Sequence, residues 1–403
     1  MMQSTDSVIA EKVSNHIHDD LAFSILSKLP LKSLKRFSCV RKSWSCLFEN
    51  SNFLNMYRNY FISSTYEEDG PCLLLQQTLP YLPNLHVLYL LFGERFENKV
   101  KLNWPPPFQE DNIAIHILGP VINGIVCLYQ GREPVVILWN PATEEYKVLP
   151  PSPTESPVLY EEVYYYVHGF GYDHVRDDYK VIRYVSYSLD VPDDFEGDID
   201  GEPIKLSRDN MWEIYNLRSN SWRKLDLDLP RAHHGWVGVY VYMKGVCHWY
   251  QDEFEHKGYL VSFDISNEVF CTTPLPLYMN DSFDSVFLLR YLMVLNDHVA
   301  LISNYVEMTT FHISILGELG VKESWTKLFV IGPLPCIEHP IGEGKNGDLF
   351  FKRKDGELVR FNLSTQVIDE LGLKGEFGCC QIVNYKESSL PIGQINDRLC
   401  LCQ

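Results

Sequence analysis

Large apolar residues recur at helical spacing only near the start of the chain. Between residues 18 and 48 they stand three or four positions apart, which is the repeat of one helix face. The positions are Leu21, Ile25 and Leu29 in one run, then Leu34, Phe37, Val40 or Arg41, and Trp44 in the next. Pro30 ends the first run, because proline disfavours helical geometry in the residue before it. The pattern predicts three short helices. Such a unit is too small to bury its own apolar stripe well, so a partner surface is expected to cover it.

After about residue 70 the helical period disappears. Short runs rich in Val, Ile, Tyr, Phe and Trp are broken about every 8–12 residues by Gly, Pro, Asn or Asp, which is typical of strands joined by turns. The segment 65–71, Thr-Tyr-Glu-Glu-Asp-Gly-Pro, combines charge with Gly-Pro and is typical of a linker. We therefore expect a disordered N-terminus over 1–15, a helical domain over 16–60, a linker over 61–71 and an all-β domain over 72–403.

An internal repeat runs through the β-like region and decides its architecture. The unit 137–150, Ile-Leu-Trp-Asn-Pro-Ala-Thr-Glu-Glu-Tyr-Lys-Val-Leu-Pro, predicts a strand, a polar turn and a second strand, and it has echoes further along. The residues just before the turn are Asn140, Asn216, Asp264, about His312, and Asn362, at gaps of 76, 48, 48 and 50. The long gap contains a polar, acidic stretch, 190–210, which we interpret as an insertion.

A sixth and fainter copy lies one repeat before Asn140, near Phe92 and a turn at 93–98. A four-stranded repeat of roughly 40–50 residues is typical of a β-propeller, in which each blade covers an apolar face that its neighbour cannot bury alone. Six copies predict about six blades. The run 381–402 is then a candidate for completing the first blade and closing the ring.

Charge is unevenly spread along the chain, which has a formal net charge of −18. Residues 1–60 hold 8 Lys and Arg against 5 Asp and Glu, whereas residues 61–403 hold 27 against 48. An acidic body repels phosphate backbones and anionic lipid heads. Nucleic acid and membrane surfaces are therefore disfavoured as partners, and a basic protein surface is favoured.

The cysteines and the apolar runs indicate the compartment. The chain has 11 cysteines without regular spacing, set in apolar runs, as buried free thiols are in a reducing compartment. No apolar stretch approaches the roughly 18–20 residues of a membrane helix. The N-terminus also lacks the basic and then apolar layout of a signal peptide. We expect a cytoplasmic or nuclear protein.

Five motifs occur in a fixed order along nearly the whole chain. They are 29–44, Leu-Pro-Leu-Lys-Ser-Leu-Lys-Arg-Phe-Ser-Cys-Val-Arg-Lys-Ser-Trp, followed by Phe53; 123–128, Asn-Gly-Ile-Val-Cys-Leu; 169–173, Gly-Phe-Gly-Tyr-Asp, leading to 178–181, Asp-Tyr-Lys-Val; 245–249, Gly-Val-Cys-His-Trp; and 323–328, Glu-Ser-Trp-Thr-Lys-Leu. With these motifs the chain resembles the large plant family of F-box proteins that carry an F-box-associated or kelch-like domain.

The resemblance implies a fold and a function. The fold is a small all-α F-box of three helices followed by an all-β kelch-like β-propeller. The function is that of a substrate-recognition subunit of an SCF-type E3 ubiquitin ligase. In such complexes the F-box binds a Skp-family adaptor and, through it, a cullin, while the propeller binds a protein target. Carried over by position, the adaptor-facing residues are Ile17, Leu21, Ile25, Leu29, Pro30, Leu34, Val40 and Trp44.

The chain departs from the family pattern in two places. Ile17-His18 stands where the family usually has Leu-Pro, which keeps the apolar group but loses the rigid proline and predicts weaker adaptor binding. The repeats also lack the Gly-Gly pair of a standard kelch blade. Two alternatives therefore stay open. One is a propeller scaffold without ligase activity, and the other is a propeller that binds a sugar or small ligand or acts as a hydrolase.

The motifs that could carry chemistry favour structural interpretations. Aligned on a calcium-binding EF-hand loop, 196–207 ends in Ser207 instead of the bidentate Glu, so a solvated acidic loop is expected. Neither His233-His234 nor Cys247-His248 has metal-ligand spacing, and His248 is expected in the core. Nothing singles out a catalytic carboxylate pair or a Ser/His/Asp set. We expect no metal, no cofactor and no catalytic residue.

The remaining candidates concern turns, packing and the target. Gly342-Glu-Gly-Lys345 lacks the spacing of a phosphate loop and is interpreted as a turn before a strand at 348–352. The repeated tryptophans, Trp139, Trp212, Trp222, Trp249 and Trp325, are expected to pack between blades. Target binding is expected on loops at one face of the ring, with Asp190 to Glu202 preferred over Pro150 to Glu162.

Overall fold

The computed structural model describes two compact units, Met1–Phe61 and Ile62–Gln403. The described residues are 19–29, 31–37, 40, 42–45, 50, 52–53, 56–57, 72–79, 82–108, 115–130, 135–153, 161–189, 210–226, 240–251, 258–276, 288–305, 309–344, 347–375, 380–388 and 392. The predicted N-terminal tail over 1–15, the linker over 61–71 and most of the acidic insertion lie outside these residues.

The N-terminal unit contains three short helices among its described residues: α1 (Asp19–Leu26), α2 (Leu31–Phe37) and α3 (Lys42–Ser45). Its interior holds Ala22, Leu26, Leu34, Phe53 and Tyr57, each almost fully buried. The Phe53 ring meets the Phe23 ring edge-on and stacks on the Tyr57 ring, with centroids 5.7 and 6.3 Å apart. The three-helix domain over 16–60 stays a prediction, because much of that range lies outside the described residues.

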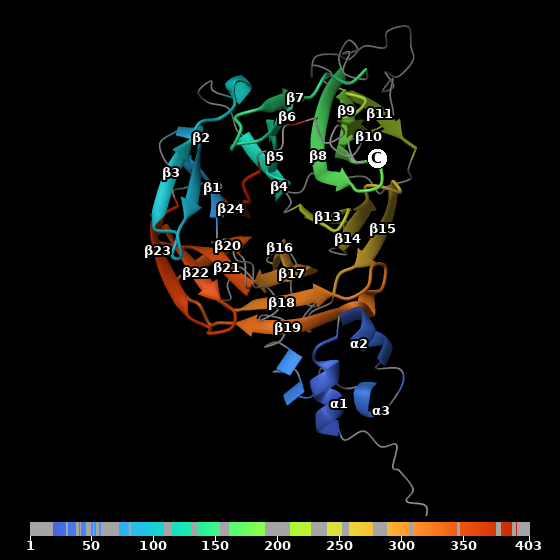
Figure 1. Cartoon of the computed structure of the whole chain (residues 1–403), viewed down its shortest axis with the longest axis vertical. Coiled ribbons are helices and arrows are strands. Elements are labelled where there is room, and N and C mark those ends of the chain that lie inside the picture. The colour runs from blue at the N-terminus through green and yellow to red at the C-terminus, as the bar shows by residue number, and fades with distance from the viewer. Residues whose placement is uncertain are drawn as a thin grey trace, which may run out of the picture. The chain divides into compact units, whose positions relative to one another are not determined.

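The second unit is a β-propeller of six four-stranded sheets, arranged around a common centre (Figure 1). We number the blades in ring order. Blade 1 is β24 (Cys380–Asn384), β1 (Cys72–Leu79), β2 (Leu82–Phe92) and β3 (Asn98–Leu102). Blade 2 is β4 (Ile115–Ile122), β5 (Ile125–Gln130), β6 (Val136–Trp139) and β7 (Tyr146–Val148). Blade 3 is β8 (Glu161–Asp173), β9 (Asp178–Leu189), β10 (Met211–Asn216) and β11 (Ser221–Leu225).

The other three blades have the same antiparallel order. Blade 4 is β12 (Val241–Met243), β13 (Val246–Gln251), β14 (Tyr259–Asp264) and β15 (Val269–Pro274). Blade 5 is β16 (Leu288–Leu295), β17 (His298–Tyr305), β18 (Phe311–Leu316) and β19 (Trp325–Ile331). Blade 6 is β20 (Ile337–Glu343), β21 (Asp348–Arg353), β22 (Glu357–Asn362) and β23 (Ile368–Lys374). The prediction of about six blades is confirmed.

The ring is closed by β24, which comes from the far end of the chain and pairs with β1. The register runs antiparallel from Leu73 opposite Asn384 to Gln77 opposite Cys380. The first strand of each blade, β24, β4, β8, β12, β16 or β20, contacts the first strand of the next blade, so these six inner strands form a closed circle. The prediction that the run beginning at Gln381 completes the first blade is confirmed for its described part.

The repeated Asn or Asp ends the third strand of a blade and builds the turn that follows. The Oδ1 atom of Asp264 accepts hydrogen bonds from the backbone N–H groups of Ser266 and Asn267 at 2.9 and 2.8 Å. Asn362 Oδ1 does the same for Ser364 and Thr365. Four residues after each repeated Asn or Asp, the backbone takes a left-handed conformation. The residues in this conformation are Glu144, Asn220, Glu268 and Gln366. The sequence repeat is therefore a repeated turn, because an Asn or Asp side chain can hold the backbone in this shape.

In blade 5 the residue predicted to stand just before the turn, His312, was placed wrongly. His312 is the second residue of β18, and the strand continues to Leu316. The turn that follows has no Asn or Asp at its start. It is built instead by the short 3-10 helix Lys322–Ser324 and by Ser324 Oγ, which donates to the carbonyls of Glu318 and Val321.

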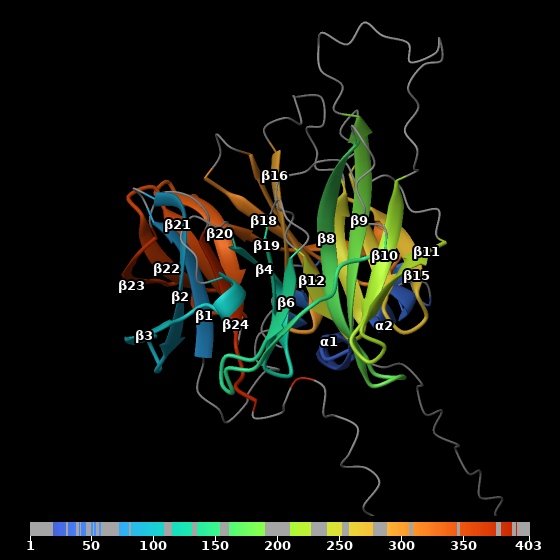
Figure 2. The same ribbon diagram turned by 90° about the horizontal axis from the view of Figure 1, so that it is seen from above.

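The two faces of the ring differ in how the strands are connected. In blades 2 to 5 a tight turn joins the first strand to the second, and the connections between third and fourth strands lie on the same face of the ring. Two of these turns are Asn123-Gly124 and Lys244-Gly245, where positive φ at both positions matches the two-residue hairpin turn. The connections 190–209 and 227–239 join strand ends on the opposite face. Figure 2 shows the coloured turns of blade 3 at the lower edge of the ring.

Ring closure makes a testable prediction about Ile382 on β24. This side chain is 3% exposed and packs with Leu73, Ile341 and Phe350, so it joins blade 1 to blade 6. We expect Ile382→Ala to lower the free energy of unfolding by about 2–4 kcal/mol, because it leaves a cavity in the seam. Urea denaturation measures the loss. The matched control is Ile368→Ala on the outer strand β23, where the side chain is 41% exposed. An equal loss in both variants would contradict the closure role of β24.

Candidate functional sites

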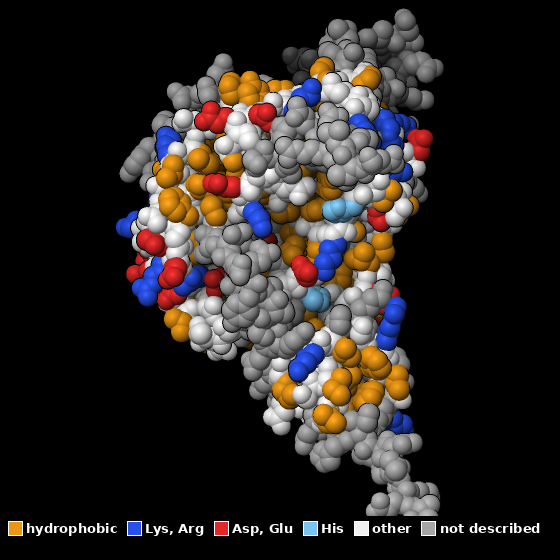
Figure 3. All heavy atoms as spheres, in the orientation of Figure 1, with side chains coloured by type: hydrophobic (Ala, Val, Ile, Leu, Met, Phe, Trp, Pro, Cys, Tyr) orange, Lys and Arg blue, Asp and Glu red, His pale blue; other side chains and the backbone are white. Residues whose placement is uncertain are grey.

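Helix α1 presents two large aliphatic side chains to solvent. Leu21 is 57% exposed and Ile25 is 52% exposed. They stand four residues apart, so they lie on the same face of the helix. Val40, after α2, is 70% exposed. Figure 3 shows hydrophobic side chains gathered over the helical unit. Exposed aliphatic groups in adjacent turns are expected where a helix meets a partner.

The other residues predicted to face an adaptor are placed differently. Leu34 is 1% exposed and lies in the interior of the helical unit, so little of its side chain is available to a partner. Leu29 is half-buried. Trp44 is also half-buried, and its ring meets that of Phe37 edge-on with centroids 6.1 Å apart. Ile17 and Pro30 lie outside the described residues. Contact of any of these residues with an adaptor stays a prediction.

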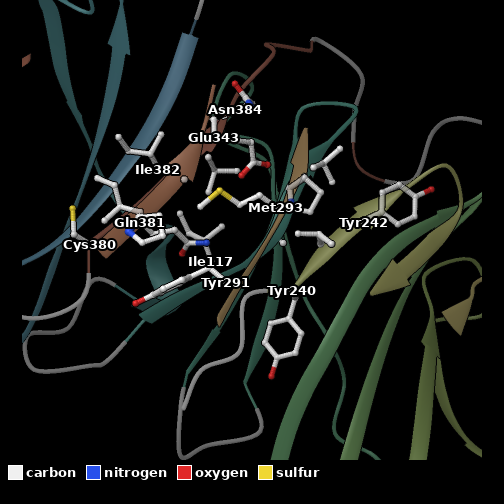
Figure 4. A pocket seen from close by; sticks show the side chains of 18 of the residues that line it. Ile117, Tyr240, Tyr242, Tyr291, Met293, Glu343, Cys380, Gln381, Ile382 and Asn384 are labelled. Atoms are coloured by element: carbon white, nitrogen blue, oxygen red, sulfur yellow. Dashed lines mark hydrogen bonds between the residues drawn. The ribbon is translucent and has the colours of Figure 1, made fainter. Parts of the chain in front are cut away.

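The propeller has a cavity of about 440 Å³ at its centre. It is lined by residues of the inner strands β4, β12, β16, β20 and β24 (Figure 4). Much of the wall is apolar, formed by side chains such as Ile117, Met293, Ile341 and Ile382. Tyr240, Tyr242 and Tyr291 also line it. The volume is within the range of about 300–1,000 Å³ that is usual for small-molecule sites.

Glu343 is the acidic residue among those that line the cavity, and no Lys or Arg is among them. Its carboxylate accepts a hydrogen bond from the backbone N–H of Val294, and no ion pair to it occurs among the described residues. Burial raises the pKa of Glu343 from 4.5 to about 7, because the apolar wall disfavours the charged form. The same effect lowers the pKa of His339, so this imidazole is neutral at pH 7.

The sequence interpretation missed Glu343 because it placed Gly342-Glu-Gly-Lys345 in a turn. The structure extends β20 through Glu343, and the turn begins only at Gly344. Only glycine fits at position 342 without a shift of the backbone, because a Cβ there would overlap the carbonyl oxygen of Ile382 on β24. A glycine inside a strand often marks the close approach of another backbone, so Gly342 was the signal in the sequence that β20 continues to Glu343.

Buried ion pairs join blade 3 to its neighbours. Lys180 Nζ lies 2.8 Å from Asp173 Oδ2 and 2.9 Å from Glu268 Oε1 in blade 4, and it donates to the carbonyl of Ile265 at 3.0 Å. Burial opposes the charge on Asp173, yet hydrogen bonds from Lys180, Ser266 and Arg176 outweigh it and hold the pKa of Asp173 below its usual range. The motifs 169–173 and 178–181 therefore supply Asp173 and Lys180 to an ion-pair network that joins blades 3 and 4.

Arg183 forms a second buried ion pair, in which its Nε and Nη2 atoms donate to Glu213 Oε2 at 3.0 and 2.9 Å. Ser152, which follows blade 2, donates to Glu213 Oε1 at 2.7 Å. The tryptophans pack between blades as predicted, with Trp222 Nε1 donating to the Pro150 carbonyl at 2.8 Å. His248 is buried with Nδ1 2.9 Å from Ser262 Oγ, as predicted for a core residue.

Comparison with known proteins decides the family. Residues 94–400 match the family described as F-box associated beta propeller domain. The chain belongs to this family. In this member of the family, the F-box associated propeller has six blades and is closed by the pairing of β24 with β1.

The curated relatives of this F-box associated propeller are plant F-box proteins. F-box protein At5g15660 of Arabidopsis thaliana is 26% identical over 79% of this chain and 66% of its own length. F-box only protein 8 of Arabidopsis thaliana is 25% identical over 67% of this chain and 83% of its own length. The resemblance to plant F-box proteins is confirmed. Because the chain spans 66% of the first relative, the activity and partners of the whole protein are matters for proposal.

The described residues of the F-box associated propeller and its helical unit form neither a metal-ligand cluster nor a membrane-spanning helix. Within them, no three His, Cys, Asp or Glu side chains are grouped as metal ligands would be. None of the helices in the same residues is long and apolar enough to cross a membrane. His233-His234, Asp190 to Glu202 and the middle of Pro150 to Glu162 lie outside the described residues.

The raised pKa of Glu343 predicts a pH-dependent stability of the F-box associated propeller. Folding raises this pKa from 4.5 to about 7, so the protonated carboxyl group adds to the free energy of unfolding. This contribution is fully present below pH 4.5 and is lost as pH rises toward and through 7. Between pH 5.5 and 8 the loss is at most about 2 kcal/mol, less where water in the channel screens the charge. Chemical denaturation at pH 5.5 and at pH 8 should give the same free energy of unfolding for Glu343→Gln, apart from the pH dependence of other groups.

The exposed Glu94, in the turn between β2 and β3, provides the control. Glu94→Gln is expected to keep the pH dependence of the wild type. If Glu343→Gln keeps it as well, the carboxylate of Glu343 is not held away from water as the structure indicates.

Proposed function

We propose that this chain is the substrate-recognition subunit of an SCF-type E3 ubiquitin ligase. The helical unit binds a Skp-family adaptor and, through it, a cullin, and the propeller binds a protein target. The observation that carries the proposal is the pair of exposed aliphatic side chains, Leu21 and Ile25, on one face of α1 in a chain whose relatives are F-box proteins. A cytoplasmic or nuclear location, where the ligase works, is part of the proposal.

The physical argument for adaptor binding rests on area. Burying apolar surface contributes roughly 25 cal/mol per Å², and a few large side chains usually supply most of the affinity of an interface. Leu21, Ile25 and Val40 are more than half exposed, so most of their apolar area is available to a partner. Leu34, by contrast, already contributes to folding of the helical unit.

The propeller is proposed to hold the target without chemistry of its own. Ubiquitin transfer is then accelerated by proximity, because a bound target has a high effective concentration near the ubiquitin-loaded enzyme. No cofactor is needed in this chain. The proposed target-binding loop, Asp190 to Glu202, lies between β9 and β10 in the sequence. The acidic net charge of residues 61–403 suits a target with a basic surface.

The test is co-purification of the full chain with a Skp-family adaptor. We expect Leu21→Asp with Ile25→Asp to reduce the amount of bound adaptor at least about tenfold, because two charged groups would have to be desolvated at the interface. Both positions are exposed, so the helical unit should keep its melting behaviour.

The matched control is Val269→Asp on β15, an aliphatic residue that is 55% exposed on the propeller. It should bind adaptor as the wild type does. Undiminished adaptor binding by the double variant would overturn the proposed docking face. Absence of adaptor from the wild-type preparation would favour a propeller scaffold without ligase activity.

A further inference from the structure

We infer that the central cavity of the propeller binds an organic ammonium cation, with the charged nitrogen against the Glu343 carboxylate and an apolar body along the channel. Neither the family assignment nor the proposed ligase function provides such a site. The inference is also independent of the adaptor, because every residue that carries it lies in the propeller.

The first argument is that the partly buried carboxylate of Glu343 has no ion-pair partner among the described residues. Glu343 projects from the end of β20 into the cavity, as Figure 4 shows. The backbone N–H groups of Val294 and of Glu343 itself satisfy part of its hydrogen-bonding capacity. Asn384 Nδ2 donates to the Glu343 backbone carbonyl at 3.1 Å instead of to the side chain. An ionised carboxylate that is removed from water without a partner is costly, and a cationic ligand would remove that cost.

The second argument is the chemistry of the walls. Met293 and Ile117 supply apolar surface in the cavity, and Tyr291 on β16 also lines it. The rings of Tyr240 and Tyr242 point away from the carboxylate and pack in the seams between blades (Figure 4). Aromatic faces attract cations and also pack against the apolar body of an ammonium compound. A site with one carboxylate, the Tyr291 ring and apolar side chains suits an amine better than a sugar, which needs many hydrogen-bonding groups.

The third argument is the placement of the charge along the channel. All inner strands run toward the face of the tight turns, so Glu343, Val294 and Asn384 lie toward that face, at or near the ends of their strands. His339 lies four residues earlier on β20, at most about 13 Å toward the opposite face, because the register of β20 shifts between Pro340 and Gly342. An ammonium group at Glu343 can therefore extend an apolar body over about this length.

Other ligand classes fit this cavity less well. No Lys or Arg is among the lining residues, so an anionic ligand would meet Glu343 without compensation. A calcium or magnesium ion needs several oxygen ligands, and the described residues group no such set. The shared chemistry is thus an ammonium group on an apolar stem. Its source is either a free small amine or the side chain of a lysine on the bound protein target.

The experiment is calorimetric titration of the full chain with phenylpropylammonium chloride, with phenylpropanol as its neutral counterpart. We expect the cation to bind and the alcohol to bind at least about tenfold more weakly, because the alcohol has no charge to pair with Glu343. Glu343→Gln keeps the size of the side chain and should weaken cation binding at least about tenfold. Glu94→Gln should bind as the wild type does.

A parallel titration with Nα-acetyl-lysine amide distinguishes the two sources. Tighter binding of this probe than of phenylpropylammonium supports a target lysine, and the reverse order supports a free amine. Equal binding of the cation and the alcohol, cation binding unchanged in Glu343→Gln, or no binding of either amine to the folded wild type would overturn the inference. The adaptor co-purification test is unaffected by all of these results.

Discussion

The pairing of β24 with β1 is the interaction on which the rest of the propeller depends. A blade can bury its inner apolar faces only against its neighbours, so an open row of blades would leave two faces uncovered. Buried clusters fill the seams on both sides of blade 1. Leu75 and Phe350 pack between blades 6 and 1, and Leu74 and Ile117 pack between blades 1 and 2. Strand β24 contributes to both clusters, through Ile382 and Val383.

Closure also creates the cavity. The six inner strands contact one another in a circle, and residues of five of them line the channel. Val294, Glu343 and Asn384 are far apart in the sequence, yet the circle places them at the same level of the ring. The Glu343 carboxylate meets no Lys or Arg side chain among the described residues there, because the residues that line the cavity are mainly apolar or aromatic. The site thus follows from ring closure and not from a local motif.

The sequence predicted the architecture well because the repeat has a local cause. Asn140, Asp264 and Asn362 cap their turns with a side-chain oxygen, so the pattern can be recognised without knowledge of distant contacts. The prediction lost register in blade 5, where Ser324 and a 3-10 helix build the turn without an Asn or Asp at its start. It also missed the cavity, since Glu343 acquires its environment from strands that are distant in the sequence. Lys180 and Arg183 are buried ion-pair partners, which alternation of polar and apolar residues alone does not reveal.

The helical unit shows a similar limit. A helical period identifies Leu21, Ile25 and Leu34 as apolar positions, but it does not say which of them face inward. The central claim is that Leu21 and Ile25 connect a target-binding propeller to the ligase. Proximity labelling in plant cells under proteasome inhibition, with the wild type and the Leu21→Asp, Ile25→Asp variant, tests it most directly. The account predicts that the adaptor and cullin disappear from the labelled proteins of the variant while the other neighbours of the propeller remain. Equal labelling of adaptor and cullin by both proteins would contradict it.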